Sequence, residues 1–385
     1  KCNVTDNLHS SLCLIRQIVI AIIFGILAVL SLLYKLRNIY STLSISVTLT
    51  DGVQTVFDYC QYMVDLYFVY QYGRHVCYQY LKQYTAIDAI MGPSRYCAAI
   101  KQRMAKLTAF FITVWLVSSV GDYAAWVMSY KWTVPLSFSL TYVYVLIKIL
   151  TTIDLTLQVI HIQCRLRTVG DIAQAYYTNA EAIHVDHTSS MDDTVQCKNW
   201  FYSDNCKSGS DVHITNMMPK SNLQMKWLSR CYLLITEQCQ YVNRMFGIRI
   251  LLNSLSLFID MVRFTNLIVR LIIGKQNNPN NSNYFPVVST LMRLFMCVAI
   301  LVSLVDHCEK TYRQQDRVIS IIDHLFIYKN PDAELREAMT ELRALMQSRP
   351  IQFHLANFFS LNYSLLISTA SVVSTYTIIL LQSMN

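Results

Sequence analysis

Charged and aromatic side chains occur inside strongly apolar stretches of the chain, where a charge must find a partner or water. Aromatic rings offer stacking surface and a few polar groups fix orientation, a composition typical of a small-molecule pocket. The candidate ligand residues are Asp122, Tyr123, Trp126, Tyr142, Phe264, Asn266, Thr290 and Arg293. The alternative interpretation is structural, because Asp122 and Arg293 could pair with each other or with Arg263.

The sequence contains no motif that would carry catalysis. P-loop, G-x-S-x-G, H-E-x-x-H and G-x-G-x-x-G patterns are all absent. His184, His187, Cys197 and Cys206 are of zinc-binding types, but their H-x2-H…C-x8-C spacing fits no compact site. We therefore expect no enzyme activity, no metal and no cofactor.

Composition indicates a membrane protein. The 385 residues are 54% hydrophobic and only 15% charged, against about 25% charged in ordinary soluble domains. The apolar residues gather in blocks of about 20, enough to cross a hydrocarbon core of about 30 Å. The formal charge of +8 comes from basic residues at the ends of these blocks, and no nucleic-acid motif accompanies it. We predict an all-α polytopic membrane protein that does not bind nucleic acid.

About seven stretches are predicted to span the membrane: 17–34, 45–70, 107–128, 134–160, 246–273, 284–305 and 358–381. The second is interrupted by Asp51, Asp58 and Asp65. A helix with one polar face can still cross a membrane if that face looks into the bundle or a water-filled cavity. Lys148 and Asp154 lie in the fourth stretch, and we expect them to pair with neighbouring helices.

Basic residues set the orientation, because Lys and Arg accumulate on the cytoplasmic side. Six of them separate the second and third spans: Arg74, Lys82, Arg95, Lys101, Arg103 and Lys106. This places the N-terminus inside and the C-terminus outside, and the candidate pocket then opens outward. The predicted organisation is spans one to four in 1–165, cytosolic helical extensions with a mobile loop in 166–245, spans five and six in 246–306, cytosolic helices in 307–357 and a final helix in 358–385.

An amphipathic helix is predicted within the second cytosolic stretch. Asn330 can cap its start and Pro350 ends it. Its apolar stripe consists of Leu335, Met339, Leu342 and Met346. Such a stripe needs a partner surface, which favours a packed cytosolic layer; a helix lying on lipid headgroups is the alternative.

The final stretch carries a polar stripe on an otherwise apolar helix. Its members recur at spacings of three and four and fall within roughly 80° of the helix circumference: Ser368, Ser371, Thr375, Ile379 and Gln382. In a symmetric oligomer such a surface could line a shared, water-filled axis. Ordinary helix packing is the alternative, since Ser and Thr are favoured between membrane helices, although the Gln382 amide favours water.

The same stretch resembles a known family. Thr375-Tyr376, five mainly aliphatic residues and Gln382 are similar to the T-Y-(five hydrophobic)-Q-F signature that closes the insect gustatory receptors. Residues 349–353 and 357–366 resemble the run leading into that family's last helix. Ser383 stands where the family has Phe, so the gate would be closed otherwise, with Ile379 and Gln382.

The resemblance implies a homotetramer or heterotetramer, with the final helices around a cation-conducting pore and the cytosolic helices joining the subunits. Ser371, Thr375, Ile379, Gln382 and Ser383 would then form the pore and gate. A small-molecule tastant would enter from outside, in the plasma membrane of chemosensory neurons, and the bundle would contact lipid. Sugar-sensing members often have Glu after T-Y, whereas this chain has Thr377, which favours bitter or other plant and dietary compounds.

Two other classes of membrane protein share the span count or the composition. A G-protein-coupled receptor also has about seven spans, but with the opposite orientation, and its D-R-Y and N-P-x-x-Y motifs are absent. A small-solute transporter commonly has internal repeats and Gly/Pro-broken helices at midplane, and the sequence has neither.

Orientation separates the channel from the G-protein-coupled receptor. We expect an epitope tag placed after Asn385 to be stained on intact cells, because the basic loops hold the other end of the last span inside. A tag before Lys1 should be stained only after permeabilisation. The reverse staining pattern would reject the predicted topology.

Overall fold

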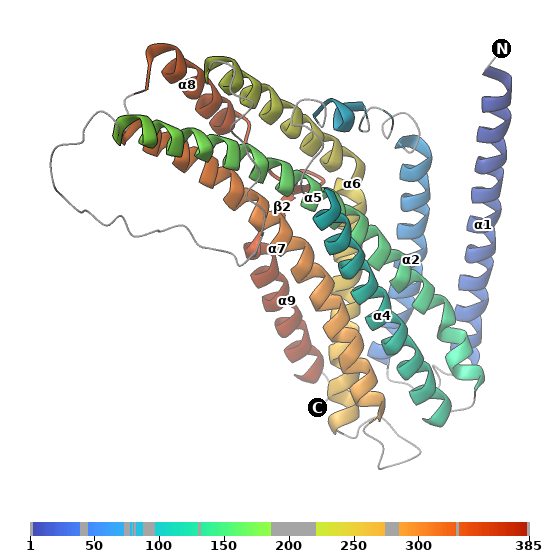
Figure 1. Cartoon of the computed structure of the whole chain (residues 1–385). Helices are drawn as coiled ribbons and strands as arrows, with labels where there is room; N and C mark the ends of the chain where they lie inside the picture. Colours follow the sequence, from blue (N-terminus) through green and yellow to red (C-terminus); the bar gives the residue numbers. More distant parts are fainter. Residues whose placement is uncertain are drawn as a thin grey trace. The chain divides into compact units, whose positions relative to one another are not determined.

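The computed structural model describes residues 3–38, 45–72, 78, 80, 82–87, 97–129, 132–185, 221–273, 285–328 and 331–382. Its elements, in chain order, are α1 (Asn3–Asn38), α2 (Ile45–Tyr72), α4 (Cys97–Ser129), α5 (Thr133–Val185), α6 (Ser221–Ile273), α7 (Phe285–Tyr328), α8 (Ala333–Ser348), β1 (His354–Leu355), β2 (Phe359–Ser360) and α9 (Tyr363–Gln382) (Figure 1). The predicted all-α class is confirmed. Within the described residues, β1 and β2 form a two-stranded hairpin.

Five of the described helices, α1, α4, α5, α6 and α7, are long and apolar enough to cross a membrane. The other two predicted spans are also helices. α2 carries the three aspartates, and the apolar part of α9, Tyr363–Ile379, is shorter than the other spans. The seven predicted stretches thus correspond to seven described helices, five of which are long and apolar enough to cross a membrane.

The chain forms two compact units. Unit 1 comprises Lys1–Cys164, Glu237–Tyr312 and Ile351–Asn385, and unit 2 comprises Arg165–Thr236 and Arg313–Pro350. α5, α6 and α7 each contribute one part to unit 1 and another to unit 2. Unit 2 consists of stretches that the sequence analysis assigns to the cytosol, an assignment that stays a prediction.

Unit 2 is organised around the amphipathic helix α8. Its buried residues are Ala338, Met339, Leu342 and Met346. The Gln315 amide donates to the Met346 carbonyl at 3.2 Å, and the Tyr232 hydroxyl donates to the Arg349 carbonyl at 2.8 Å. The predicted cap is wrong: the N-cap is Asp332, without a side-chain capping bond, and Asn330 lies outside the described residues. Burial of the apolar stripe, rather than a cap, holds α8.

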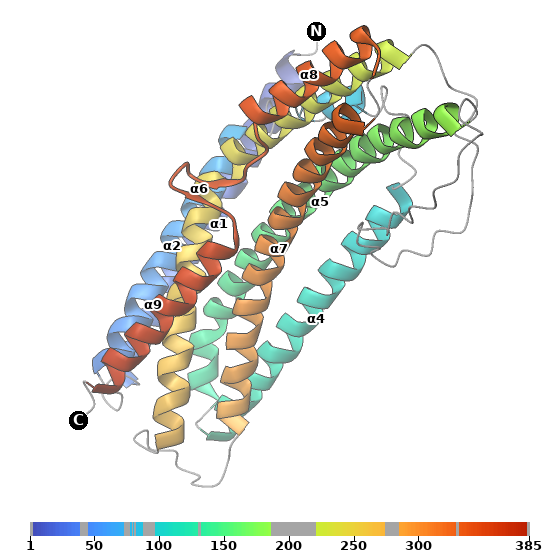
Figure 2. The same ribbon diagram turned by 90° about the vertical axis from the view of Figure 1, so that its left-hand side faces the viewer.

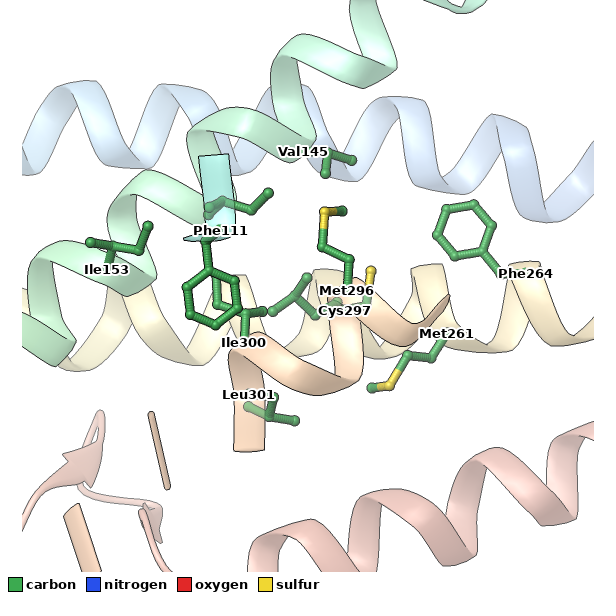
Figure 3. Packing of buried hydrophobic residues seen from close by; sticks show 11 residues of the cluster. Phe111, Val145, Ile153, Met261, Phe264, Met296, Cys297, Ile300 and Leu301 are labelled. Atoms are coloured by element: carbon green, nitrogen blue, oxygen red, sulfur yellow. The ribbon is translucent and has the colours of Figure 1, made fainter. Parts of the chain in front are cut away.

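The core of unit 1 joins four long helices. Phe111 of α4, Val145 of α5, Phe264 of α6 and Met296 of α7 belong to one buried cluster (Figure 3). Leu366 and Val373 of α9, both partly buried, pack against it. The last helix therefore rests on the bundle along one face only.

A buried polar seam joins α2 to α6, and we call these contacts the α2–α6 seam. Asp51 pairs with Arg263 at 2.9 Å, and Asp65 pairs with Arg249 at 2.7 Å. Between these ion pairs, Ser256 donates to Asp58 at 2.9 Å and Gln61 donates to Asn253 at 2.9 Å. Along these four contacts the residue numbers rise in α2 and fall in α6, so the two helices run antiparallel. A single register of the two helices forms all four contacts.

The seam also holds α5 and α1. The Lys148 ammonium lies 2.7 Å from both Asp58 and Asp260 and is 2% exposed, as expected for pairing with neighbouring helices. Lys35 of α1 lies 3.0 Å from Asp51. The polar face predicted for 45–70 therefore looks into the bundle. Asp154 of α5, which was expected to pair with a neighbouring helix, has an exposed side chain.

A charge exchange tests the seam at its outermost pair. Asp65→Arg or Arg249→Asp alone leaves two like charges facing each other in a nearly buried position, where loss of a partner costs about 3–5 kcal/mol. We expect each single variant to lose most of its cell-surface protein, measured by surface biotinylation. The double variant should recover a large part of it; a double variant as poor as the single ones would contradict direct pairing.

Candidate functional site

A cluster around Asp122 joins three helices of unit 1. The Asp122 carboxylate, 3% exposed, accepts hydrogen bonds from Tyr142 Oη at 2.7 Å and from Ser289 Oγ at 3.0 Å. Arg293 Nη1 donates to the same carboxylate at 3.0 Å and forms an ion pair with it. α4, α5 and α7 are therefore tied together at one buried charge.

The Arg293 guanidinium lies against two aromatic rings. Its central carbon is 4.5 Å from the Tyr142 ring centroid and 5.3 Å from that of Phe264. Nη2 is buried and has no hydrogen-bond partner. A buried donor left unpaired costs about 1–3 kcal/mol, so an acceptor at this point would stabilise the cluster. We call Asp122, Tyr142, Phe264, Ser289 and Arg293 the guanidinium cage.

The structure brings together four of the eight predicted ligand residues, namely Asp122, Tyr142, Phe264 and Arg293. Thr290 donates to the Pro286 carbonyl of its own helix, and Asn266 accepts from Arg270 Nε at 3.0 Å. Tyr123 is 37% exposed.

One predicted ligand residue is not described, and one residue of the cage escaped prediction. The side chain of Trp126 lies outside the described residues. Ser289 was not predicted; it precedes Arg293 by one helical turn on the same face of α7, and this spacing is the signal that could have identified it.

The cage lies beside adaptable apolar residues. Met261, Met296 and Cys297 belong to the same buried cluster as Phe264, and Figure 3 shows Met296 pointing toward Val145. Methionine side chains are flexible and adapt to irregular shapes. This environment can admit an apolar body by repacking, while the polar groups of the cage stay fixed by the ion pair.

The polar stripe of α9 lies on the exposed surface of the single chain. Ser371, Thr375 and Gln382 are exposed, and Ile379 is 52% exposed. The Thr375 hydroxyl donates to the Ser371 carbonyl at 2.9 Å, within the helix. Figure 2 shows α9 (dark red) running along the outside of unit 1 near α6. Tyr376 of the family motif contacts the Phe258 ring edge-on at 6.5 Å, and Ser383 lies outside the described residues.

A non-helical segment precedes α9. The predicted helix start at 358 is wrong, because α9 begins at Tyr363 and β1 and β2 form a hairpin before it. Ala356 and Asn357 have φ of 50° and 63°, the left-handed conformation that Asn tolerates at a turn. The Asn362 carboxamide oxygen accepts from the Leu365 N–H at 3.3 Å, which caps the helix.

Side chains of α6 and α7 anchor this segment. The Asn243 amide donates to the Gln352 carbonyl at 2.8 Å and accepts from the His354 N–H at 3.2 Å. The Phe353 N–H donates to the Tyr312 hydroxyl at 3.0 Å, and the Tyr363 hydroxyl donates to Asp306 at 3.0 Å. The base of α9 is therefore fixed by polar bonds, while its upper part is held by one apolar face.

Outside unit 1, an open hollow of ≈ 310 Å³ lies on α7 in unit 2, between Asp316 and Tyr328. Its Asp323 pairs with Arg343 at 2.8 Å, and His324 stacks on Tyr328. Among the described residues, no group of three or more His, Cys, Asp or Glu side chains could hold a metal ion.

Long apolar helices joined by buried ion pairs, with a further apolar helix at the end, define a polytopic α-helical membrane protein. Residues 4–383 match the 7tm Chemosensory receptor family, and the chain belongs to this family. The match confirms the chemosensory class that the C-terminal motif predicts.

A solved structure agrees in fold. The insect olfactory receptor OR5 from Machilis hrabei, in complex with eugenol, matches with a TM-score of 0.56 and 12% identity over 94% of this chain and 88% of that chain. The structure reported for OR5 without a named ligand has a TM-score of 0.49 over the same shares. Comparison with curated proteins gives no match.

Substitutions at two glycines test whether the hairpin at the base of α9 packs against α6. A Cβ on Gly247 would lie 3.2 Å from the Ala356 backbone nitrogen, whereas a Cβ on Gly121 would meet nothing within 4 Å. We expect Gly247→Val to cost about 2 kcal/mol through overpacking and to lower the melting temperature of the purified protein. Gly121→Val is the matched control and should leave it nearly unchanged; equal effects would show that the hairpin does not rest on α6.

Proposed function

We propose that this protein is a gustatory receptor that acts as a ligand-gated, non-selective cation channel. The observation that carries the proposal is the polar stripe of α9, which is exposed on the single chain and includes Thr375 and Gln382 of the family motif. A small tastant from outside the cell opens the channel. The protein is not an enzyme and does not bind nucleic acid.

The exposed stripe favours a pore shared between copies. An amide such as Gln382 in hydrocarbon needs a partner or water, and a symmetric oligomer supplies both by placing its last helices around one axis. We propose a homotetramer or a heterotetramer with related receptors. Ile327 and Tyr328 of α7, 73% and 67% exposed, support contacts between copies through the cytosolic helices. Hydroxyl groups and one amide per subunit discriminate little among small cations.

Ligand binding inside unit 1 opens the pore by shifting an existing equilibrium. A ligand favours the open form only if it binds that form more tightly. The anchored hairpin keeps the base of α9 in place, so the outer ends of the four helices separate. The eugenol complex of OR5 supports a small-molecule ligand, and the T-Y…Q motif with Thr377 favours taste and a bitter or other dietary compound over sugars.

The proposed setting is the plasma membrane of chemosensory neurons, with lipid around the bundle. Apolar residues exposed on α1, among them Ile22, Ile26 and Leu30 at 55–56% exposure, support contact with hydrocarbon. Expression of the chain alone in a cell without other chemosensory receptors is the simplest test of conduction.

Cysteine accessibility tests which face of α9 lines the pore. Thr375→Cys lies on the stripe and Ala370→Cys lies about 140° away around the helix; both positions are exposed on the single chain. We expect a positively charged, membrane-impermeant thiol reagent to reduce ligand-evoked current by more than half in Thr375→Cys, because it adds bulk and charge inside the conduit. Ala370→Cys is the control and should be unaffected.

Two outcomes would contradict the proposal. Equal block at both positions, or at Ala370→Cys alone, would place the conduit elsewhere. Metabotropic responses without ligand-evoked current, even with candidate partner subunits, would favour a G-protein-coupled receptor instead.

A further inference from the structure

We propose that the guanidinium cage recognises a neutral or anionic ligand through an acceptor oxygen bound to Arg293 Nη2, and that it rejects ligands whose only polar group is an ammonium. The inference rests on the proposed function, because it names the ligand class of the same receptor. It narrows the dietary compounds to carbonyl, carboxylate or ether compounds with an apolar or aromatic body.

The first argument is the free donor. Arg293 Nη1 is engaged by Asp122, which fixes the plane of the guanidinium, while Nη2 is buried without a partner. The rings of Tyr142 and Phe264 lie close to the same group. A donor held in one direction close to two rings selects an acceptor oxygen attached to a flat or apolar body.

The second argument is that the carboxylate is already occupied. Asp122 Oδ2 accepts from Arg293 and Tyr142, and Oδ1 accepts from Ser289. An ammonium ligand would have to displace one of these donors. Displacement of Arg293 would leave a buried guanidinium without its counter-ion, which is strongly unfavourable.

The third argument is the balance of the surrounding charge. Arg263 and Arg293 both lie over the Phe264 ring, at 5.8 and 5.3 Å from its centroid. Arg263 shares Asp51 with Lys35. Lys148 in turn pairs with both Asp58 and Asp260. Four cations (Lys35, Lys148, Arg263 and Arg293) thus face four anions (Asp51, Asp58, Asp122 and Asp260), and no surplus negative charge remains to attract an ammonium.

The fourth argument is the adaptability of the apolar side chains beside the cage. Met261, Met296 and Cys297 are packed in the same cluster as Phe264 (Figure 3). Flexible thioether side chains can give way to an apolar group. The polar end of the ligand is therefore selected strictly, and the apolar body loosely.

The test uses the purified full chain in detergent and four probes with the same phenyl body: phenylacetone, phenylacetate, phenethylammonium and propylbenzene. Thermal stabilisation is measured for each probe at equal millimolar concentrations. We expect the ketone and the carboxylate to raise the melting temperature by several degrees, and the ammonium and the hydrocarbon to raise it by less than a third as much.

Two variants assign the effect to Arg293. Arg293→Lys keeps the charge beside Asp122 but removes Nη2, and we expect the apparent Kd for the ketone and the carboxylate to rise about tenfold or more. The matched control is Asp65→Asn with Arg249→Gln, which neutralises a different buried pair and should retain the wild-type Kd. Arg293→Gln with Asp122→Asn is the second variant if the lysine variant does not fold, with the same expected loss.

Several results would overturn the inference: a larger shift with the ammonium, no shift with any of the four probes, or equal affinity in wild type and Arg293→Lys. The measurement requires no current, so it is independent of conduction. Binding of the ketone without ligand-evoked current would reject the channel proposal alone, whereas currents evoked only by ammonium compounds would reject the cage inference alone.

Discussion

The pairing of buried charges with counter-charges governs how the described helices of unit 1 pack. Asp51, Asp58 and Asp65 repeat every seven residues, which is two helical turns, so they lie on one face of α2. Each of the three forms an ion pair, with Arg263 and Arg249 of the antiparallel α6 and with Lys148 of α5. Sliding α2 by one turn would leave buried carboxylates unpaired, at a cost far above that of a lost apolar contact. The α2–α6 seam therefore fixes how the two helices meet.

The same constraint divides unit 1 into a rigid part and an adaptable part. Helices tied by ion pairs hold their positions, whereas the neighbourhood of Met261 and Met296 is apolar, and thioether side chains adapt to irregular shapes. α9 lies beyond that neighbourhood, bonded at its base through Tyr363 and packed above through Leu366 and Val373. An element with few buried contacts and a fixed end is the one that moves at low cost. Leu366 and Val373 thus bring the last helix into contact with the buried cluster of the bundle.

Local signals in the sequence were sufficient for some features and misleading for others. Three of the four residues predicted for the apolar stripe of α8, namely Met339, Leu342 and Met346, are buried, because period and composition specify an amphipathic helix. Its start was misplaced, because Asn330 and Asp332 are equally suitable caps in sequence. The hairpin before α9 was missed: Phe358 and Phe359 read as apolar helix, yet Ala356 and Asn357 adopt left-handed turns seated against Gly247 of α6.

The sequence alone determined the class of protein, the seven helical stretches, the polar stripe of the last helix and the chemosensory family, because block length, periodicity and a terminal motif are local properties. Only the tertiary structure decided which charges meet. The sequence left Asp122 free to bind a ligand, Arg293 or Arg263, and the fold pairs it with Arg293 and gives Arg263 to Asp51. Such choices depend on the register and rotation of helices far apart in the chain, and a one-dimensional pattern does not contain these quantities.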